Sequence, residues 1–137
     1  MKESYYFSED GICTINFAYS EKGVACYGDL IKVSIALDTG KLAGFDAKNY
    51  LMNHKNRNLT VAELSEENAK SLLSPSLEVI SSRLAVIPLD TGKEGLCYEF
   101  HCRDKDKKEV LVYLDAVTGK QLDLLILLYS DGGILTK

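Results

Sequence analysis

The chain has 137 residues, of which 46% are hydrophobic and 26% are charged, and its formal net charge is −4. It is long enough to bury a core but too short for a large catalytic barrel. Its composition is typical of a soluble globular domain. Because Lys and Arg form no cluster, the sequence argues against nucleic-acid binding, which depends on concentrated positive charge. The longest apolar run, residues 124–129, is far too short to cross a bilayer, so we expect no membrane insertion by this stretch.

Alternating apolar residues predict strands in the first third of the chain. The first predicted strand covers residues 12–19 and the second covers residues 31–37, which run into the turn sequence Thr39-Gly40-Lys41. The glycine of that sequence accepts the positive φ that tight turns demand. A short helix is predicted over residues 46–54, with Asp46 as its N-cap.

The middle of the chain predicts a helix followed by a long strand. Ser65 is a suitable N-cap, and the two glutamates after it favour the first turn of a helix over residues 65–73. Ala69, Leu72 and Leu73 would form its apolar stripe, and a proline after them ends the helix. A strand over residues 77–87 changes its apolar parity near Ser81-Ser82, which indicates a bulge or bend.

The last third predicts three more strands and reveals an internal repeat. The strands are expected over residues 96–102, 110–116 and 121–129. Residues 31–41 align with residues 110–120, since both alternate apolar side chains and end in Thr-Gly-Lys.

The sequence therefore predicts an α+β fold made of two related units, residues 1–58 and 59–137. The second unit contains the helix over residues 65–73, whereas the counterpart of that helix in the first unit would precede Met1. We thus expect the sequence to be a fragment of a longer protein that begins inside a repeat.

The four cysteines, Cys13, Cys26, Cys97 and Cys102, do not form the close pairs that zinc sites use. Cys97 and Cys102 lie an odd number of positions apart in a predicted strand, so their side chains should leave opposite faces. The same geometry separates His101 from Cys102, which argues against a cysteine–histidine nucleophile pair there. We expect free thiols, mostly buried as small apolar side chains.

Asp-Thr-Gly occurs at Asp38 and at Asp90, and it is the sequence around the catalytic carboxylates of aspartic proteases. Both copies run into a lysine, and the repeat places Val117 where Asp38 stands, so hairpin turns are the better interpretation. Asp104 and Asp106 superficially resemble a calcium loop but lack its glycine and distal glutamate, which favours a polar hairpin tip.

His54 and His101 have no acidic partner nearby in the sequence, and a catalytic triad assembled in space is not excluded by sequence alone. Histidines on the surface or at the edge of the core are the preferred interpretation. No nucleophile elbow, phosphate loop or dinucleotide fingerprint is present. The sequence thus predicts no catalytic, cofactor-binding or metal-binding residue, and no enzyme.

Several separate stretches resemble the C-terminal region of the YpeB family of sporulation and germination proteins. The similarity covers nearly the whole chain, although Gly28 stands where a proline is expected and the family's membrane anchor and first repeats are absent. The stretches that carry it are Tyr27-Gly28-Asp29-Leu30-Ile31-Lys32-Val33, Ala36-Leu37-Asp38-Thr39-Gly40, Gly44-Phe45-Asp46-Ala47, Tyr50-Leu51-Met52-Asn53-His54, Arg83-Leu84-Ala85-Val86-Ile87-Pro88 and Cys97-Tyr98-Glu99-Phe100.

The resemblance implies PepSY-like repeats, each a short helix packed on a small antiparallel sheet, with the first repeat lacking its helix. It further implies a non-catalytic partner that stabilises or restrains the spore cortex-lytic enzyme SleB, with a propeptide-like inhibitor of secreted proteases as the alternative. The full-length protein would lie in the spore, on the exported side of the inner membrane or in the cortex. An open edge at residues 77–87 or 121–129 could receive a partner strand.

Overall fold

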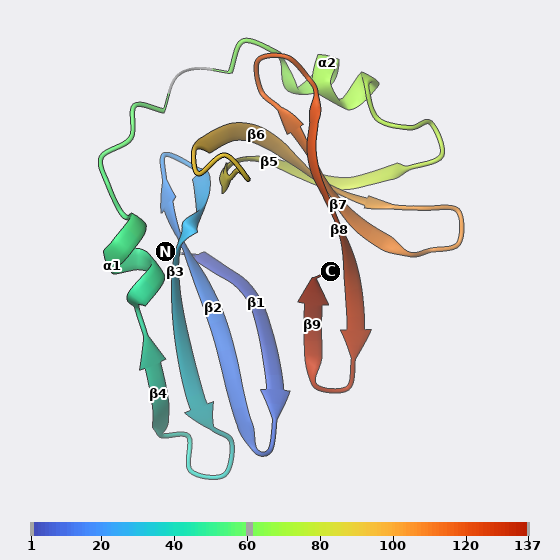
Figure 1. The fold of residues 1–137 in the computed structure, drawn as a ribbon. Coiled ribbons are helices and arrows are strands. Elements are labelled where there is room, and N and C mark those ends of the chain that lie inside the picture. Colours follow the sequence, from blue (N-terminus) through green and yellow to red (C-terminus); the bar gives the residue numbers. More distant parts are fainter. Residues whose placement is uncertain (1, 60–61, 137) are drawn as a thin grey trace. The chain divides into compact units, whose positions relative to one another are not determined.

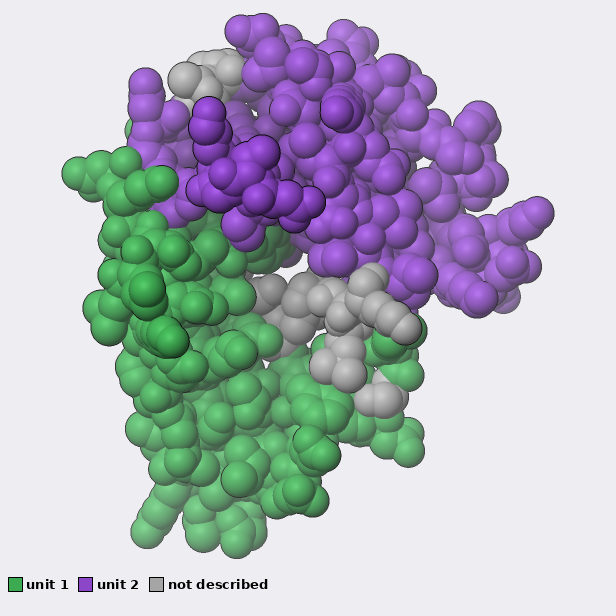
Figure 2. Space-filling view, in the orientation of Figure 1, with its two compact units in different colours: residues 1–56, 128–136 green, residues 57–127, 137 purple. Residues whose placement is uncertain are grey.

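The computed structural model describes residues 2–59 and 62–136, which are mostly strands with two short helices (Figure 1). They form two compact units, coloured green and purple in Figure 2. Unit 1 comprises residues 2–56 and 128–136, and unit 2 comprises residues 57–59 and 62–127. Within these ranges, neither helix has the length and apolar character that crossing a bilayer requires.

Unit 1 is built on an antiparallel meander in which each of the first strands pairs with the next. The pairing of β1 with β2 was not predicted, and it closes through the two-residue turn Asp10-Gly11, in which both φ angles are positive. The elements of this unit are β1 (Lys2–Glu9), β2 (Ile12–Glu21), β3 (Val24–Ala36), β4 (Leu42–Asp46), α1 (Lys48–Asn53) and β9 (Gly133–Thr136).

Unit 2 has a second antiparallel meander, which follows a helix. The predicted bulge is confirmed, since the register of the first two strands shifts between Val79 and Ser81. The predicted helix and strands are found with small shifts of their ends. They are α2 (Glu66–Ser71), β5 (Glu78–Pro88), β6 (Glu94–Arg103), β7 (Glu109–Asp115) and β8 (Gln121–Ser130), whose last three residues belong to unit 1.

Helix α2 begins as predicted but buries a smaller apolar stripe than expected. The Ser65 hydroxyl accepts the N–H of Asn68 at 3.1 Å, which caps the first turn. Ala69 is fully buried against the sheet and Leu73 packs against the same core, whereas the Leu72 side chain is 57% exposed. The helix ends at Ser71, so Leu72 is its C-cap rather than part of the buried stripe.

Helix α1 is shorter than predicted, and its N-cap is Ala47 rather than Asp46. Asp46 still stabilises the helix start, because its Oδ1 accepts the N–H of Lys48 at 2.9 Å. No residue of α1 is buried.

The two meanders have the same strand register. In unit 1 a row of directly paired residues runs Tyr6, Ile15, Val33, Phe45 across four strands, and a second row runs Ser8, Cys13, Ile35, Leu42. The rows at the equivalent places in unit 2 are Ser82, Phe100, Val112, Leu124 and Leu84, Tyr98, Leu114, Gln121.

The turns that follow β3 and β7 are also the same. The N–H of Gly40 donates to the carbonyl of Ala36 at 2.8 Å, and the N–H of Gly119 donates to that of Asp115 at 2.9 Å. Their φ angles are +71° and +74°, a region in which a side chain is strained. The predicted glycine turns are therefore confirmed in both copies.

These turns allow a matched test of how α2 packs. Gly40→Ala and Gly119→Ala should each cost about 1–2 kcal/mol from the positive φ alone. A Cβ at residue 119 would in addition meet Leu64 Cδ2 at 3.2 Å and the side chain of Leu72, whereas one at residue 40 meets nothing. We expect Gly119→Ala to be the more destabilising in urea denaturation, and equal losses would contradict this packing.

The core of unit 2 lies between α2 and one face of its sheet. The buried side chains there form a single cluster: Ala69, Tyr98, Phe100, Cys102, Val112, Leu114 and Ala116. In unit 1 the side chains of Ile15, Val33 and Ile35, which occupy equivalent positions, are only half-buried. The burial of the two sheets therefore differs although their registers agree.

Candidate functional site

A buried carboxylate and a histidine form a pair in unit 1. Asp29, on β3, is fully buried, and its Oδ2 lies 2.8 Å from Nδ1 of His54, which is 30% exposed. Beside them, Asn53 Nδ2 donates to the carbonyl of Gly28 at 2.9 Å. These contacts hold the end of α1 against β3, so His54 lies at the edge of the core, as expected, and has an acidic partner that the sequence did not reveal.

Two tyrosine rings flank this histidine. Tyr50 stacks on the His54 ring with centroids 4.5 Å apart, and Tyr19 meets the same ring edge-on at 4.6 Å. Burial, and next the carboxylate of Glu21, raise the pKa of the Tyr19 hydroxyl, so it stays protonated at neutral pH. The aromatic contacts and the carboxylate fix the orientation of the imidazole, and the cluster joins α1, β2 and β3.

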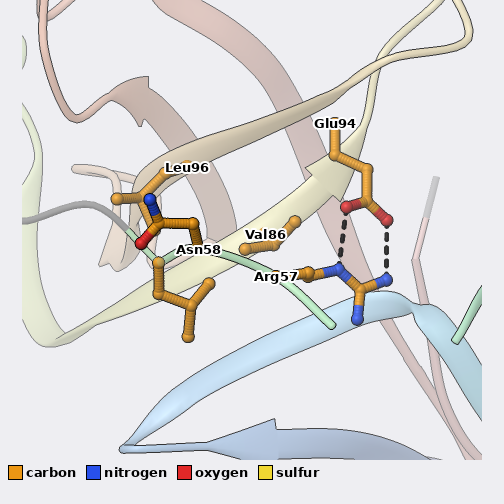
Figure 3. A pocket seen from close by; sticks show the side chains of 6 residues that line it. Arg57, Asn58, Val86, Glu94 and Leu96 are labelled. Atoms are coloured by element: carbon orange, nitrogen blue, oxygen red, sulfur yellow. Dashed lines mark hydrogen bonds and ion pairs between the residues drawn. The ribbon is translucent and has the colours of Figure 1, made fainter. Parts of the chain in front are cut away.

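Unit 2 contains a small pocket of about 190 Å³ (Figure 3). Arg57 and Glu94 pair across it through two hydrogen bonds of 2.8 and 2.7 Å, and the Arg57 side chain is only 5% exposed. Because the positive charge of Arg57 and the negative charge of Glu94 compensate each other, this pair gives the pocket no net charge. Its lining residues are Arg57, Asn58, Leu59, Val86, Glu94 and Leu96.

A buried glutamate links three strands of unit 2 on the face away from the α2 core. Glu99, on β6, is 4% exposed. Arg83 Nε on β5 donates to its Oε1 at 2.6 Å, and the Tyr113 hydroxyl on β7 donates to its Oε2 at 2.7 Å. No motif in the sequence indicates this network, which ties neighbouring strands together through charge-assisted hydrogen bonds.

All four cysteines are free, as predicted, although Cys13 is only half-buried. Cys102 lies in the core under α2, and Cys97 lies outside that cluster, with its thiol 3.4 Å from the carbonyl of Ala85. Burial raises the pKa of both thiols, and that of Cys97 reaches about 12 with a smaller contribution from nearby carboxylates. Neither thiol is activated as a nucleophile at neutral pH.

The raised pKa of Cys97 should make stability fall in alkali. Below pH 9 the thiol is protonated in both states, and between pH 9 and about 12 only the unfolded chain loses its proton. Unfolding is therefore favoured by about 1 kcal/mol between pH 8 and pH 10. Denaturation at the two pH values measures this, and Cys97→Ala should show the shallower dependence; equal dependences would refute the assignment.

The residues whose sequences resemble an aspartic-protease motif or a calcium loop lie in turns within their own units. Asp38 is in the turn after β3, and Asp90 is in the turn between β5 and β6, where the N–H of Gly92 donates to the carbonyl of Leu89 at 2.9 Å. Asp104 closes the tip of the β6–β7 hairpin, since its Oδ1 accepts the N–H groups of Asp106 and Lys108.

His101 also has an acidic neighbour, because its Nε2 lies 3.4 Å from Oε1 of Glu109. The two residues are on paired strands, β6 and β7. Across the described ranges, no group of three or more His, Cys, Asp or Glu side chains is arranged to hold a metal ion.

One stretch of unit 1 carries five exposed apolar side chains. It spans the turn after β3, the strand β4 and the helix α1, and β4 pairs with β3 alone among the strands that the structure describes. The sequence suggests residues 121–129 as one open edge. The strand there, β8, has β7 and β9 as neighbours and is therefore not an edge strand. The side chains of this stretch are Leu37, 58% exposed, Leu42, 63%, Phe45, 63%, Leu51, 76%, and Met52, 73%.

Comparison with known proteins gives a consistent set of relatives. Residues 1–60 match the family model of YpeB sporulation proteins, PepSY1 and PepSY2 domains. The sporulation protein YpeB of Halalkalibacterium halodurans is 40% identical over 112 residues, which cover 82% of this chain and 25% of that protein. YpeB of Bacillus subtilis is 36% identical over 90 residues, which cover 66% of this chain and 20% of that protein.

The fold is also similar to a solved structure, the C-terminal domain of Bacillus megaterium YpeB. The TM-score is 0.83 at 30% sequence identity, and the match covers 93% of this chain and 56% of that one. The chain spans a quarter or less of the length of the curated relatives that it matches. The chain belongs to the YpeB family of sporulation proteins and corresponds to their C-terminal, PepSY-containing region.

Proposed function

We propose that this region is a non-catalytic protein-interaction module of a spore germination protein, and that it stabilises or restrains the cortex-lytic enzyme SleB. The observation that carries the proposal is the group of exposed apolar side chains between residues 37 and 52 of unit 1. Grouped exposed apolar side chains are typical of protein-binding sites. The YpeB sporulation proteins among its relatives support a role in the spore.

The same proposal includes the organisation of the chain. Residues 1–58 and 59–137 are two PepSY-like repeats, each a small antiparallel sheet, and the first repeat lacks the covering helix. The equal registers of the two meanders and the match of residues 1–60 to the PepSY family model support this division. The full-length protein acts on the exported side of the inner spore membrane or in the cortex.

Binding to a purified SleB-type hydrolase tests the proposed function. We expect saturable binding by calorimetry, and a slower loss of the hydrolase to added protease when this chain is present. Leu51→Gln/Met52→Gln removes exposed apolar surface from a helix with no buried residue, and it should weaken binding without unfolding unit 1. Failure of both this chain and the full-length protein to bind the hydrolase would refute the proposal.

A further inference from the structure

Unit 1 includes a segment from the other end of the chain. Residues 128–136 follow unit 2 in the sequence, yet they pack with residues 2–56 and share their green colour in Figure 2. They comprise the last three residues of β8, the two-residue turn Asp131-Gly132 and the strand β9. We call residues 128–136 the arm.

The arm begins where β8 has passed its last described pair with β7. That pair joins Ile126 to Val110. From there β8 continues to Ser130, and β9 returns beside it as the next strand of the sheet, with β1 on the other side of β9. The arm is therefore a hairpin end that continues from unit 2 and is held in unit 1 by its pairing with β1.

The seat of the arm on β1 is closely fitted and depends on two glycines. Gly133 is paired with Phe7. Beside this pair, the N–H of Ser8 donates to the carbonyl of Gly132. A Cβ at residue 133 would meet the carbonyl oxygen of Tyr6, and one at residue 132 would meet that of Ser8. The two backbones thus approach more closely than a side chain at either position would permit, so the seat selects a segment with glycine at both places.

The arm also protects an edge of the sheet. Within the described residues, β1 has β2 and β9 as its neighbouring strands. When the arm leaves, β1 therefore presents an open edge, which is a template for a strand of another chain. The segment that fits this edge is the arm, and every copy of the chain carries one. The arm of a second copy can form the same contacts without new complementarity, which is the basis of domain swapping.

We propose that two copies of this chain exchange their arms, so that β9 of each copy pairs with β1 of the other. The occupant of the seat is then residues 128–136 of the second copy. Because the contacts on β1 are the same in the monomer and in the dimer, the balance between them depends on protein concentration and on the chain conformation at residues 127–128. This inference is independent of the proposed function, since it needs no other protein.

Refolding at different concentrations tests the exchange. The whole chain is unfolded in urea and returned to buffer at high and at low protein concentration. Light scattering should find dimers after the first treatment and monomers after the second. The dimer should separate slowly when it is diluted, because each arm must first leave its seat. A chain that stays monomeric at every concentration would overturn the proposal.

Mixed isotope labelling identifies the copy that supplies the arm. When labelled and unlabelled chains are refolded together, the dimer should show nuclear Overhauser effects between Phe7 of one copy and Gly133 of the other. The backbone chemical shifts of β1 and β9 should match those of the monomer, because the paired residues are the same. A dimer without these intermolecular effects would be joined through another surface, and the proposal would be wrong. This measurement uses the unaltered sequence, so it does not depend on how a variant folds.

Two glycine variants provide a matched comparison. Gly133→Ala places a Cβ against the Tyr6 carbonyl, so the arm loses its seat in both forms and the dimer fraction should fall at least tenfold. Gly92→Ala also introduces a side chain at a positive φ, +80° compared with +140° at Gly133, but its Cβ meets nothing within 4 Å. It should leave the dimer fraction unchanged. Dimers that persist in Gly133→Ala, or that are lost equally in both variants, would contradict the exchange of arms.

Discussion

Replacing Phe100 with alanine should lower the free energy of unfolding of unit 2 by about 3–5 kcal/mol. The Phe100 side chain is fully buried beneath α2, and it is directly paired with Val112 on the next strand. Truncation removes most of its apolar surface and leaves a cavity that the paired strands cannot close, because both belong to a regular sheet. Denaturation followed by near-ultraviolet circular dichroism measures the loss.

A valine pair provides the matched control for this prediction. Val112 and Val33 occupy equivalent positions, but Val112 is 2% exposed and Val33 is half-buried. Val112→Ala should therefore cost about 2 kcal/mol and Val33→Ala about half as much, since less surface leaves the core. Equal losses would mean that the two faces are equally covered, which would contradict the difference in burial between the two sheets.

The strand pattern could be predicted where local chemistry specifies it. The two Thr-Gly-Lys turns form the same hydrogen bonds because glycine adopts the left-handed conformation in both copies. The strand β1 was missed since its residues do not alternate clearly, although Asp10-Gly11 is a strong hairpin sequence that could have indicated it. The local signal for this strand therefore lies in its turn rather than in its apolar pattern.

The polar contacts could not be predicted in the same way. Asp29 and His54 are 25 residues apart and meet only because α1 folds back onto β3. Arg83, Glu99 and Tyr113 come together through the register of three strands. The difference in burial between the two sheets is likewise visible only when their registers and the burial of their side chains are compared, because the residues concerned have the pattern of ordinary strand residues.

Truncation of Glu99 to alanine should destabilise unit 2 by about 3 kcal/mol. The change removes two short hydrogen bonds to a carboxylate that is 4% exposed, one from Arg83 and one from Tyr113. Hydrogen bonds to charged groups contribute more to stability than hydrogen bonds between neutral groups. In the variant, the side chain of Arg83, which is 32% exposed, regains part of its hydration, and this limits the loss. Urea denaturation of the variant measures the loss.

The equivalent row of unit 1 gives the control, because there Thr14 Oγ1 and Ser34 Oγ are 2.9 Å apart in a neutral, half-buried pair. Thr14→Val should therefore cost less than about 1 kcal/mol. In unit 2, Tyr113→Phe removes one of the two hydrogen bonds, and combining it with Glu99→Ala should destabilise by less than the sum of the single changes. Additive losses would show that the hydroxyl and the carboxylate act independently, which would contradict a stabilising hydrogen bond between them.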